Sequence, residues 1–496
     1  MKGKLRQFYT AFASGFGNLV MGMLNVWPSY TTVLYTSEDT PLSYPLSATE
    51  ESLLGSLPSL GAMAGTALVG TIINKLGRRN GGIVISLPFI LSWAIVSVTT
   101  SPILVLIARF LAGTAGGAFL VYNPVFVSEV AESSIRGALA SSSLLLYCAG
   151  ALTSYIFGWF LTYKIIIWLM LLFSVICVLL HVFVGESPTF LLRQHRDEAA
   201  KSALAFYRGV SVNNMTVLDQ FSSMKEQLLP ATELISVNTE SETKEEEAEK
   251  EKLNIDIDIR EPLKKVSSFR LLFCTPTSLK AFLVVTTLIS MQVFMGMVPV
   301  QVYAKTVFTQ ADPSRSDLYT VIFALVLVCG SLATAAIADM AGRRFLILAS
   351  SALVCGFMAA LGYLLQSQVA PPWVTVLIVM LYCFSFMFGA GTVPYVLLAE
   401  VFVPEVQNLA SMLIVEWVWF LNFLIIAIFP IMKGLLGMHG VFYAFACISL
   451  SNMVISFFIV PETKGLNNQQ IQELLSRRKN LFLCYCLFKT IIFVLT

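Results

Sequence analysis

Charged residues are scarce in this chain, and their scarcity decides the broad class of protein. Asp, Glu, Lys and Arg together make up 12% of the sequence, whereas an ordinary globular domain has about 25%. Hydrophobic residues account for 56%. This balance excludes a soluble globular protein and predicts a polytopic membrane protein.

Residues that carry metal and acid–base chemistry are also few. The chain has three His and no C-x-x-C pair, so the usual metal-ligand spacings are missing. No nucleophile–base pair or phosphate-binding loop appears either. The formal net charge is only +2, which implies no acidic polymer as a partner. We therefore expect no enzymatic activity, no metal, no cofactor and no nucleic acid, while protein partners stay undetermined.

Long apolar runs are what the chain has in abundance. A helix needs about 20 apolar residues to span the hydrocarbon of a bilayer. Twelve runs approach or exceed that length, and we predict an all-α fold of twelve transmembrane helices in two pseudo-repeated six-helix bundles. The runs are residues 8–30, 52–74, 81–100, 102–127, 138–162, 164–185, 278–304, 318–338, 345–367, 373–398, 409–432 and 438–460.

The distribution of basic residues predicts the orientation of these spans. The N-terminus and the loops after spans 2, 4 and 8 are basic, with Lys75, Arg78, Arg79, Arg136, Arg343 and Arg344. The loop after span 1, residues 31–51, has four acids and no Lys or Arg. Because basic loops stay on the cytoplasmic side, we expect both termini and the even-numbered loops to be cytoplasmic.

Three polar features recur in the same order in the two halves of the chain. The sequence Gly-Arg-Arg occurs twice, 265 residues apart, each time three residues after a short polar residue. Glu129 and Glu186 recur in the second half as Glu400 and Glu462, at offsets of 271 and 276. A repeat of this length indicates two homologous halves. We predict that the acids and arginines form a cytoplasmic ion-pair network that locks the halves together when the inside is closed. Its members are Asn74, Arg78, Arg79, Glu129, Arg136, Glu186, Asp339, Arg343, Arg344, Glu400 and Glu462.

Polar segments divide the chain into four parts. Residues 1–185 and 277–460 hold the two bundles. Residues 186–276 form a cytoplasmic mid-chain segment, in which we predict an amphipathic helix over 188–208 and a disordered acidic stretch over 240–251. Residues 461–496 form a cytoplasmic C-terminal segment with a polar helix over 466–479 and an apolar tail over 481–496. For the tail two interpretations stay open, a segment on the membrane surface and a tail without function.

Taken in order, these motifs resemble the sugar porter family of the major facilitator superfamily, and among its members the insect facilitated trehalose transporters. The resemblance runs from about residue 8 to residue 465 and includes Arg109-x3-Gly113, Glu186-Ser-Pro188 and Pro461-Glu-Thr-Lys-Gly465. It implies two six-helix bundles around a central sugar site, and transport that is passive or coupled to protons.

The resemblance also implies a set of substrate-binding residues, which this chain matches only in part. We expect the solute to contact Gln292, Tyr303, Tyr395, Trp419 and Asn422. Five positions at which the family has amides are apolar here, namely Leu144, Val293, Val298, Leu327 and Val418. Sugar hydroxyls need partners when they leave water, and each missing bond costs about 1–3 kcal/mol. We therefore predict that trehalose and glucose are handled poorly.

Acidic residues inside the predicted spans indicate whether transport is coupled to protons. Span 1 has no Asp or Glu, whereas proton-coupled members of the family carry an Asp there, so the resemblance favours passive transport. Glu416 lies inside span 11, and an ionisable residue in the membrane is a functional hypothesis by default. We interpret it as a protonated or paired acid near the central cavity, the alternative being a shifted helix register.

The function predicted from the sequence is facilitative transport of a trehalose-like or hexose-like sugar by alternating access, in an integral multi-pass protein of the plasma membrane. The partners are then a small-molecule solute and the lipid bilayer. Two alternatives stay open. The first is a transporter of a non-sugar small solute, which the depleted amides and Glu416 suggest. The second is a non-transporting membrane sugar sensor that signals through its cytoplasmic segments.

Overall fold

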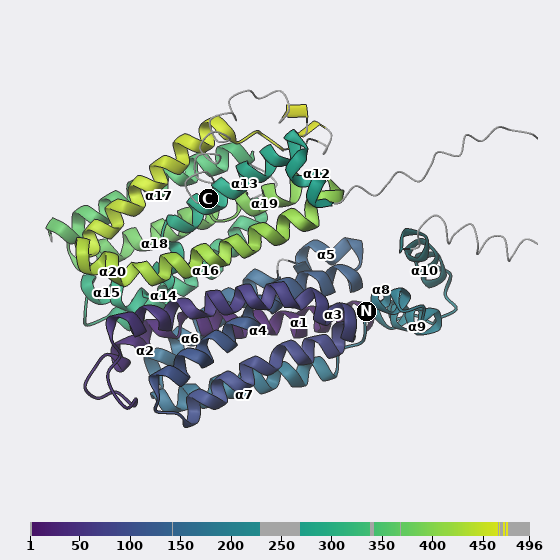
Figure 1. Cartoon of the computed structure of the whole chain (residues 1–496), viewed down its shortest axis with the longest axis horizontal. Coiled ribbons are helices and arrows are strands. Elements are labelled where there is room, and N and C mark those ends of the chain that lie inside the picture. Colours follow the sequence, from purple (N-terminus) through teal and green to yellow (C-terminus); the bar gives the residue numbers. More distant parts are fainter. Residues whose placement is uncertain are drawn as a thin grey trace, which may run out of the picture.

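The computed structural model describes residues 2–140, 142–228, 268–337, 342–367, 369–464, 466, 470–471 and 473–474. Over these residues the chain forms helices joined by short connections, and no strand occurs among them. Two groups of helices lie side by side and run along the long axis of the molecule (Figure 1). We call the group formed by α1–α7 the first half and the group formed by α13–α20 the second half.

The first half contains one helix that is far too long for a single crossing. Its elements are α1 (Lys2–Val26), α2 (Pro28–Tyr35), α3 (Ala48–Val98), α4 (Pro102–Val130), α5 (Ser133–Ala140), α6 (Ser142–Phe160) and α7 (Tyr163–Val182). A straight helix of 51 residues would measure about 77 Å, more than twice the hydrocarbon thickness of about 30 Å. Gly77 has φ 86° and interrupts α3, so α3 folds back and supplies two spans.

The second half repeats this arrangement. Its elements are α13 (Pro276–Phe294), α14 (Met297–Val302), α15 (Ala304–Ala311), α16 (Ser316–Ile337), α17 (Arg343–Ser367), α18 (Pro372–Phe388), α19 (Val393–Glu400) and α20 (Pro404–Ile459), preceded by α12 (Ser268–Cys274). Here α20 has 56 residues and is interrupted at Gly437, where φ is 68°. Both long helices thus turn at a glycine, the residue that adopts positive φ at least cost.

These helices account for the twelve predicted spans. Within the described part of the chain, nine helices are long and apolar enough to cross a membrane, and two of the nine contain α3 and α20, which cross twice each. The remaining span is α1, which is less apolar because it contains polar residues such as Gln7, Ser14 and Asn18, all three of them buried. The expected all-α fold of twelve membrane helices is confirmed.

The mid-chain segment differs from the expectation of one helix over 188–208. The structure has α8 (Pro188–Arg193), α9 (Asp197–Arg208) and α10 (Met215–Leu228). The break falls at His195, whose φ of 54° no continuous helix allows. Leu191, Leu204 and Phe221 are buried together between the three short helices. The expectations for 240–251 and 481–496 lie outside the described residues, and so does most of 466–479.

The short helices are attached to the first half. Gln7 Nε2 in α1 donates to the backbone oxygen of Tyr207, 2.8 Å away, and Arg6 donates to that of Phe206, 2.7 Å away. Figure 1 shows α8–α10 beyond the end of the bundle at which α1 begins. We call this end, which also holds both Gly-Arg-Arg loops, the Arg end, and the opposite end, which holds α2 and α15, the far end.

The two halves meet along two helix pairs, α3 with α20 and α6 with α16. Among the described residues, three hydrogen bonds join the halves toward the far end: Ser52 Oγ to the Ala427 oxygen (3.0 Å), the Lys305 N–H to Ser29 Oγ (2.8 Å) and Tyr155 Oη to the Gln301 oxygen (2.6 Å). A fourth contact, described below, lies closer to the Arg end.

Candidate functional site

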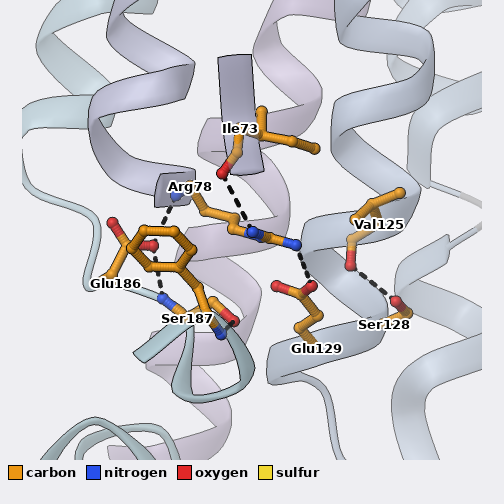
Figure 2. A network of polar contacts seen from close by, with 8 residues as sticks. Ile73, Arg78, Val125, Ser128, Glu129, Glu186 and Ser187 are labelled. Atoms are coloured by element: carbon orange, nitrogen blue, oxygen red, sulfur yellow. Dashed lines mark hydrogen bonds and ion pairs between the residues drawn. The ribbon is translucent and has the colours of Figure 1, made fainter. Parts of the chain in front are cut away.

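The first Gly-Arg-Arg loop is held by the carboxylate of Glu186 (Figure 2). Glu186 Oε1 accepts a hydrogen bond from the Arg78 N–H at 2.7 Å, and Oε2 accepts one from the Arg79 N–H at 3.2 Å. These two N–H groups begin a new helical segment, where they lack helical partners. A carboxylate there also complements the positive end of the helix dipole. Glu186 therefore fixes the turn between the two spans of α3.

The Arg78 side chain ties this turn to the neighbouring span. Its guanidinium donates to Glu129 Oε1 at 2.5 Å and to the Ile73 backbone oxygen at 3.2 Å. Arg78 is 2% exposed, so this pair is screened far less by water than a surface ion pair. Truncating one partner of such a pair leaves the other charge buried and uncompensated.

The second half repeats the same geometry. The Arg343 N–H donates to Glu462 Oε1 at 2.9 Å, and the Arg344 N–H donates to Oε2 at 3.2 Å. The Arg343 guanidinium donates to Glu400 Oε1 at 2.8 Å, while Thr463 Oγ1 donates to Glu400 Oε2 at 2.6 Å. Both networks lie inside their own half, and none of the ion pairs in the described part of the chain crosses between the halves.

Three of the predicted members take part neither in these ion pairs nor in the hydrogen bonds of Glu186 and Glu462. Arg136 is exposed, and its guanidinium reaches the backbone oxygen of Ala131 at 3.3 Å. Asn74 is exposed and forms no hydrogen bond with a described residue. Asp339 lies outside the described residues. The ion pairs are therefore centred on Arg78 and Arg343, and their role in gating stays a prediction.

The predicted substrate-binding residue Gln292 lies where two broken membrane helices meet. α13 ends at Phe294, and Gly296, with φ 87°, begins the short α14. The second break separates α18 from α19 around Gly391. Gln292 Nε2 donates to the Gly391 backbone oxygen at 3.0 Å and joins the two breaks. Irregular backbone at membrane depth is tolerated where protein covers it or where it lines a water-filled cavity.

Four of the five predicted substrate-binding residues present buried polar atoms. The atoms Gln292 Oε1, Tyr303 Oη, Trp419 Nε1 and Asn422 Oδ1 are buried and have no hydrogen-bond partner among the described residues. Buried polar groups normally have a partner, either in the protein or in ordered water. The hydrogen-bonding capacity of these four atoms is therefore unused by the described residues. Tyr395, the fifth residue, is 41% exposed and follows the break at Gly391.

Two of these aromatic residues lie against the first half. The Trp419 ring is buried in the hydrophobic cluster of the first half, although Trp419 belongs to α20. Tyr303 stacks on Phe429 with ring centroids 5.1 Å apart. A Cβ atom placed on Gly55 of α3 would lie 2.8 Å from Tyr303 Oη, so the absence of a side chain at Gly55 allows this approach. The predicted site is thus shared between the halves.

The apolar substitutions at the predicted amide positions fall in different environments. Val293, Leu327 and Val418 are buried, and Val298 is half-buried. Leu144 is 41% exposed. Three of the five therefore occupy buried positions in the second half, where an amide would need a partner of its own.

Two buried amides that were not predicted from the sequence have polar atoms without a partner among the described residues. Asn18 in α1 is fully buried, and both polar atoms of its side chain lack partners among the described residues. Gln301 in α14 is 6% exposed, and its Nε2 also lacks one. Both stand alone in apolar runs, a signal that was readable in the sequence.

Glu416 of α20 crosses to the first half. Its Oε1 lies 2.6 Å from Thr66 Oγ1 of α3, and its Oε2 is buried without a partner among the described residues. Of the two interpretations offered for Glu416, a protonated or paired acid agrees with this contact. Thr66 itself was not singled out from the sequence, since a lone Thr in an apolar run carries no distinctive signal.

Curated proteins with similar sequences are sugar transporters by name. Solute carrier family 2, facilitated glucose transporter member 8 of Bos taurus is 26% identical over 493 residues and covers 94% of both chains. The Facilitated trehalose transporter Tret1-2 homolog of Drosophila sechellia is 24% identical over 474 residues, which cover 94% of this chain and 90% of that one.

Solved structures share the fold. The inward open conformation of the xylose transporter XylE from E. coli superposes with a TM-score of 0.72 at 20% identity, covering 94% of this chain and 99% of XylE. The proton:xylose symporter XylE bound to 6-bromo-6-deoxy-D-glucose gives 0.68 at the same identity. The profile of the family described as Sugar (and other) transporter matches residues 5–237 and 221–475. This chain therefore belongs to the Sugar (and other) transporter family.

Proposed function

We propose that this protein carries a sugar passively across the plasma membrane by alternating access. The observation that carries the proposal is the meeting of two broken helices at Gln292, among buried polar atoms that have no partner in the described chain. Discontinuous helices near the bilayer midplane are where transporters of this architecture bind their solutes. Amide, phenol and indole groups offer the donors and acceptors that sugar hydroxyls require.

The two halves supply the moving parts. Each half has its own arginine network, which braces its spans at the Arg end, and three hydrogen bonds join the halves toward the far end. Two separately braced bundles can rock about a shared central site. The excess of basic residues at the Arg end supports a cytoplasmic position for that end. The arrangement with bonds toward the far end is then the one closed to the outside.

The relatives suggest the class of solute. Their names specify glucose and trehalose, and the structural neighbours are described as xylose transporters. All three are polyhydroxylated and uncharged, which fits the polar atoms of Gln292, Tyr303, Trp419 and Asn422. The loss of amides at Val293, Val298, Leu327 and Val418 favours weak binding, or a solute with fewer hydroxyl groups than trehalose.

Uptake into oocytes tests this function. Cells expressing the chain are given labelled trehalose, glucose, fructose or xylose, and a Gln292→Leu variant of equal surface expression serves as the matched control. We expect saturable uptake that stops when the inside and outside concentrations are equal, and a marked loss in the variant. Absence of uptake of every sugar at verified surface expression would contradict the proposal.

A further inference from the structure

One carboxyl group inside the membrane links the two halves. Glu416 Oε1 and Thr66 Oγ1 are 2.6 Å apart, with Glu416 in the second half and Thr66 in the first. On the same helix pair, Ser52 bonds the Ala427 oxygen toward the far end. Along α3 the two contacts are 14 residues apart, or about 21 Å, so the Glu416 contact is the one nearer the Arg end.

The number of hydrogens available indicates the protonation state of Glu416. Thr66 Oγ1 also lies 2.9 Å from the Met63 backbone oxygen, which can only accept. A hydroxyl group has one hydrogen to donate. If that hydrogen goes to Met63, the Glu416 contact is a hydrogen bond only when the carboxyl group donates, which requires it to be protonated. Both contacts are satisfied together by neutral Glu416 and not by the carboxylate.

The surroundings of Glu416 also favour the neutral acid. Around Glu416, α20 bonds α3 through Thr66 and α13 through Ser290, which accepts a hydrogen bond from Trp417 Nε1 at 2.9 Å. The nearest charged residues along these helices are nine or more positions away from the contact residues, at least about 14 Å along the helix axis; they are Glu405, Lys433, Lys75 and Lys280. A carboxylate with one oxygen buried and unpaired would be costly there.

We propose that Glu416 is a proton-binding site whose protonated form latches α20 to α3 and so stabilises this arrangement of the two halves. The inference rests on the proposed function in one respect, namely that the halves rock against each other. Acid favours the latched arrangement, since the bound proton supplies the hydrogen bond. As the pH rises and the proton leaves, Thr66 cannot satisfy both acceptors, and the carboxylate gains from reaching water. The latch opens and the populations shift.

Distances between spin labels test the latch without any need for transport. Ser128 in α4 and Asn408 in α20 are exposed residues of opposite halves at the Arg end, and each is replaced by a labelled cysteine in a chain that lacks its native cysteines. The full chain in lipid bilayers is then titrated from about pH 4.5 to about pH 8, starting near the ordinary range of a Glu side chain. We expect the ratio of the two distance populations to change roughly tenfold, the effect of about 1.4 kcal/mol.

Three substitutions identify the group responsible. Glu416→Gln keeps a donor for Thr66 but cannot ionise, so it should show the low-pH distances at every pH. Thr66→Val removes the partner and should depopulate the latched arrangement throughout. Glu405→Gln removes an exposed acid on the same helix and should leave the wild-type response unchanged. The proposal would be overturned if the wild-type distances did not change with pH, or if the pH response persisted in Glu416→Gln.

Uptake measured in parallel separates this proposal from the proposed function. With equal pH on both sides of the membrane, sugar uptake by the wild type should vary with pH and that by Glu416→Gln should not. If no sugar is taken up while the distances still respond through Glu416, the latch stands and the transport proposal fails. If sugar is taken up while the spin-label distances do not change with pH, the transport proposal stands and the latch proposal fails.

Discussion

The carboxylate of Glu186 accepts the backbone N–H groups of Arg78 and Arg79 at the turn of α3. Glu462 does the same for Arg343 and Arg344 in the second half. One acid therefore caps the start of a helical segment in each half, and the adjoining arginine side chain reaches a second acid on the next span. The repeat in the sequence corresponds to a repeated construction in space.

A side chain at Gly77 should destabilise the first network. In Gly77→Ala the new Cβ would overlap the Glu186 carboxylate, and the positive φ would disfavour any L-residue. We expect a loss of about 2 kcal/mol or more, of which the backbone alone accounts for about 1–3 kcal/mol. Gly70→Ala is the matched control, because a Cβ there meets nothing within 4 Å. Thermal unfolding in detergent measures both, and equal midpoints would contradict the prediction.

Removal of Arg78 or Arg343 should slow transport. Each guanidinium braces two spans of its half through Glu129 or Glu400, and Arg78→Ala or Arg343→Ala would leave a partly buried carboxylate without its ion pair. If the networks serve the inward gate, these variants should weaken the outward-facing state and lower turnover by roughly tenfold, the effect of about 1.4 kcal/mol.

The neighbouring arginine provides the control for this experiment. The Arg79 side chain is exposed, and in the described chain it forms no ion pair, so Arg79→Ala should transport at nearly the wild-type rate. Initial rates are compared at matched surface expression. Unchanged rates in both Arg78→Ala and Arg343→Ala would show that the networks serve stability alone.

Transport should not need a proton gradient. Span 1 has no Asp or Glu, and the only intramembrane acid in the described contacts between the halves is Glu416. An uncoupler should therefore leave initial uptake unchanged at fixed, equal pH, even though the absolute pH affects the latch. Uptake of labelled sugar with and without the uncoupler measures this. Uptake that the uncoupler abolishes would refute passive transport and point to Glu416 as the coupling residue.

Restored amides should improve sugar transport. Val293 and Val298 flank the break after α13 and follow Gln292, whose Nε2 contacts Gly391. In the double variant Val293→Gln with Val298→Asn, two partners at about 1 kcal/mol each should raise the affinity roughly thirtyfold. Bridging water would reduce this gain.

Kinetic analysis measures the gain. The apparent KM for trehalose and for glucose is compared between the wild type and the double variant, with Val293→Leu and Val298→Leu together as a control for changed side-chain size. Strong uptake by the wild type, or no improvement in a well-expressed double variant, would mean that other residues build the site. Asn18 and Gln301, both buried with unpartnered amide atoms, would then be the first candidates.

The sequence by itself determined the class of protein, the positions of the membrane spans and the duplication of the two halves. Composition and run length are enough for these, because a helix in lipid must be apolar along its whole length and must satisfy its own backbone groups. Gly77 and Gly437 lie in gaps between predicted runs, and the structure shows that the chain turns at these two glycines. The acids and arginines of the two networks could be listed from the repeat, although Arg136 forms no ion pair.

Only the tertiary structure decided which residues from distant parts of the chain come together. Glu416 and Thr66 are 350 positions apart, and nothing local in either run distinguishes one neutral partner from another. The meeting of the breaks at Gln292 and Gly391 likewise depends on how α13 packs beside α19. Periodicity along one helix reports burial, whereas a hydrogen bond between helices depends on their relative depth and rotation, which the packing of all the spans determines together.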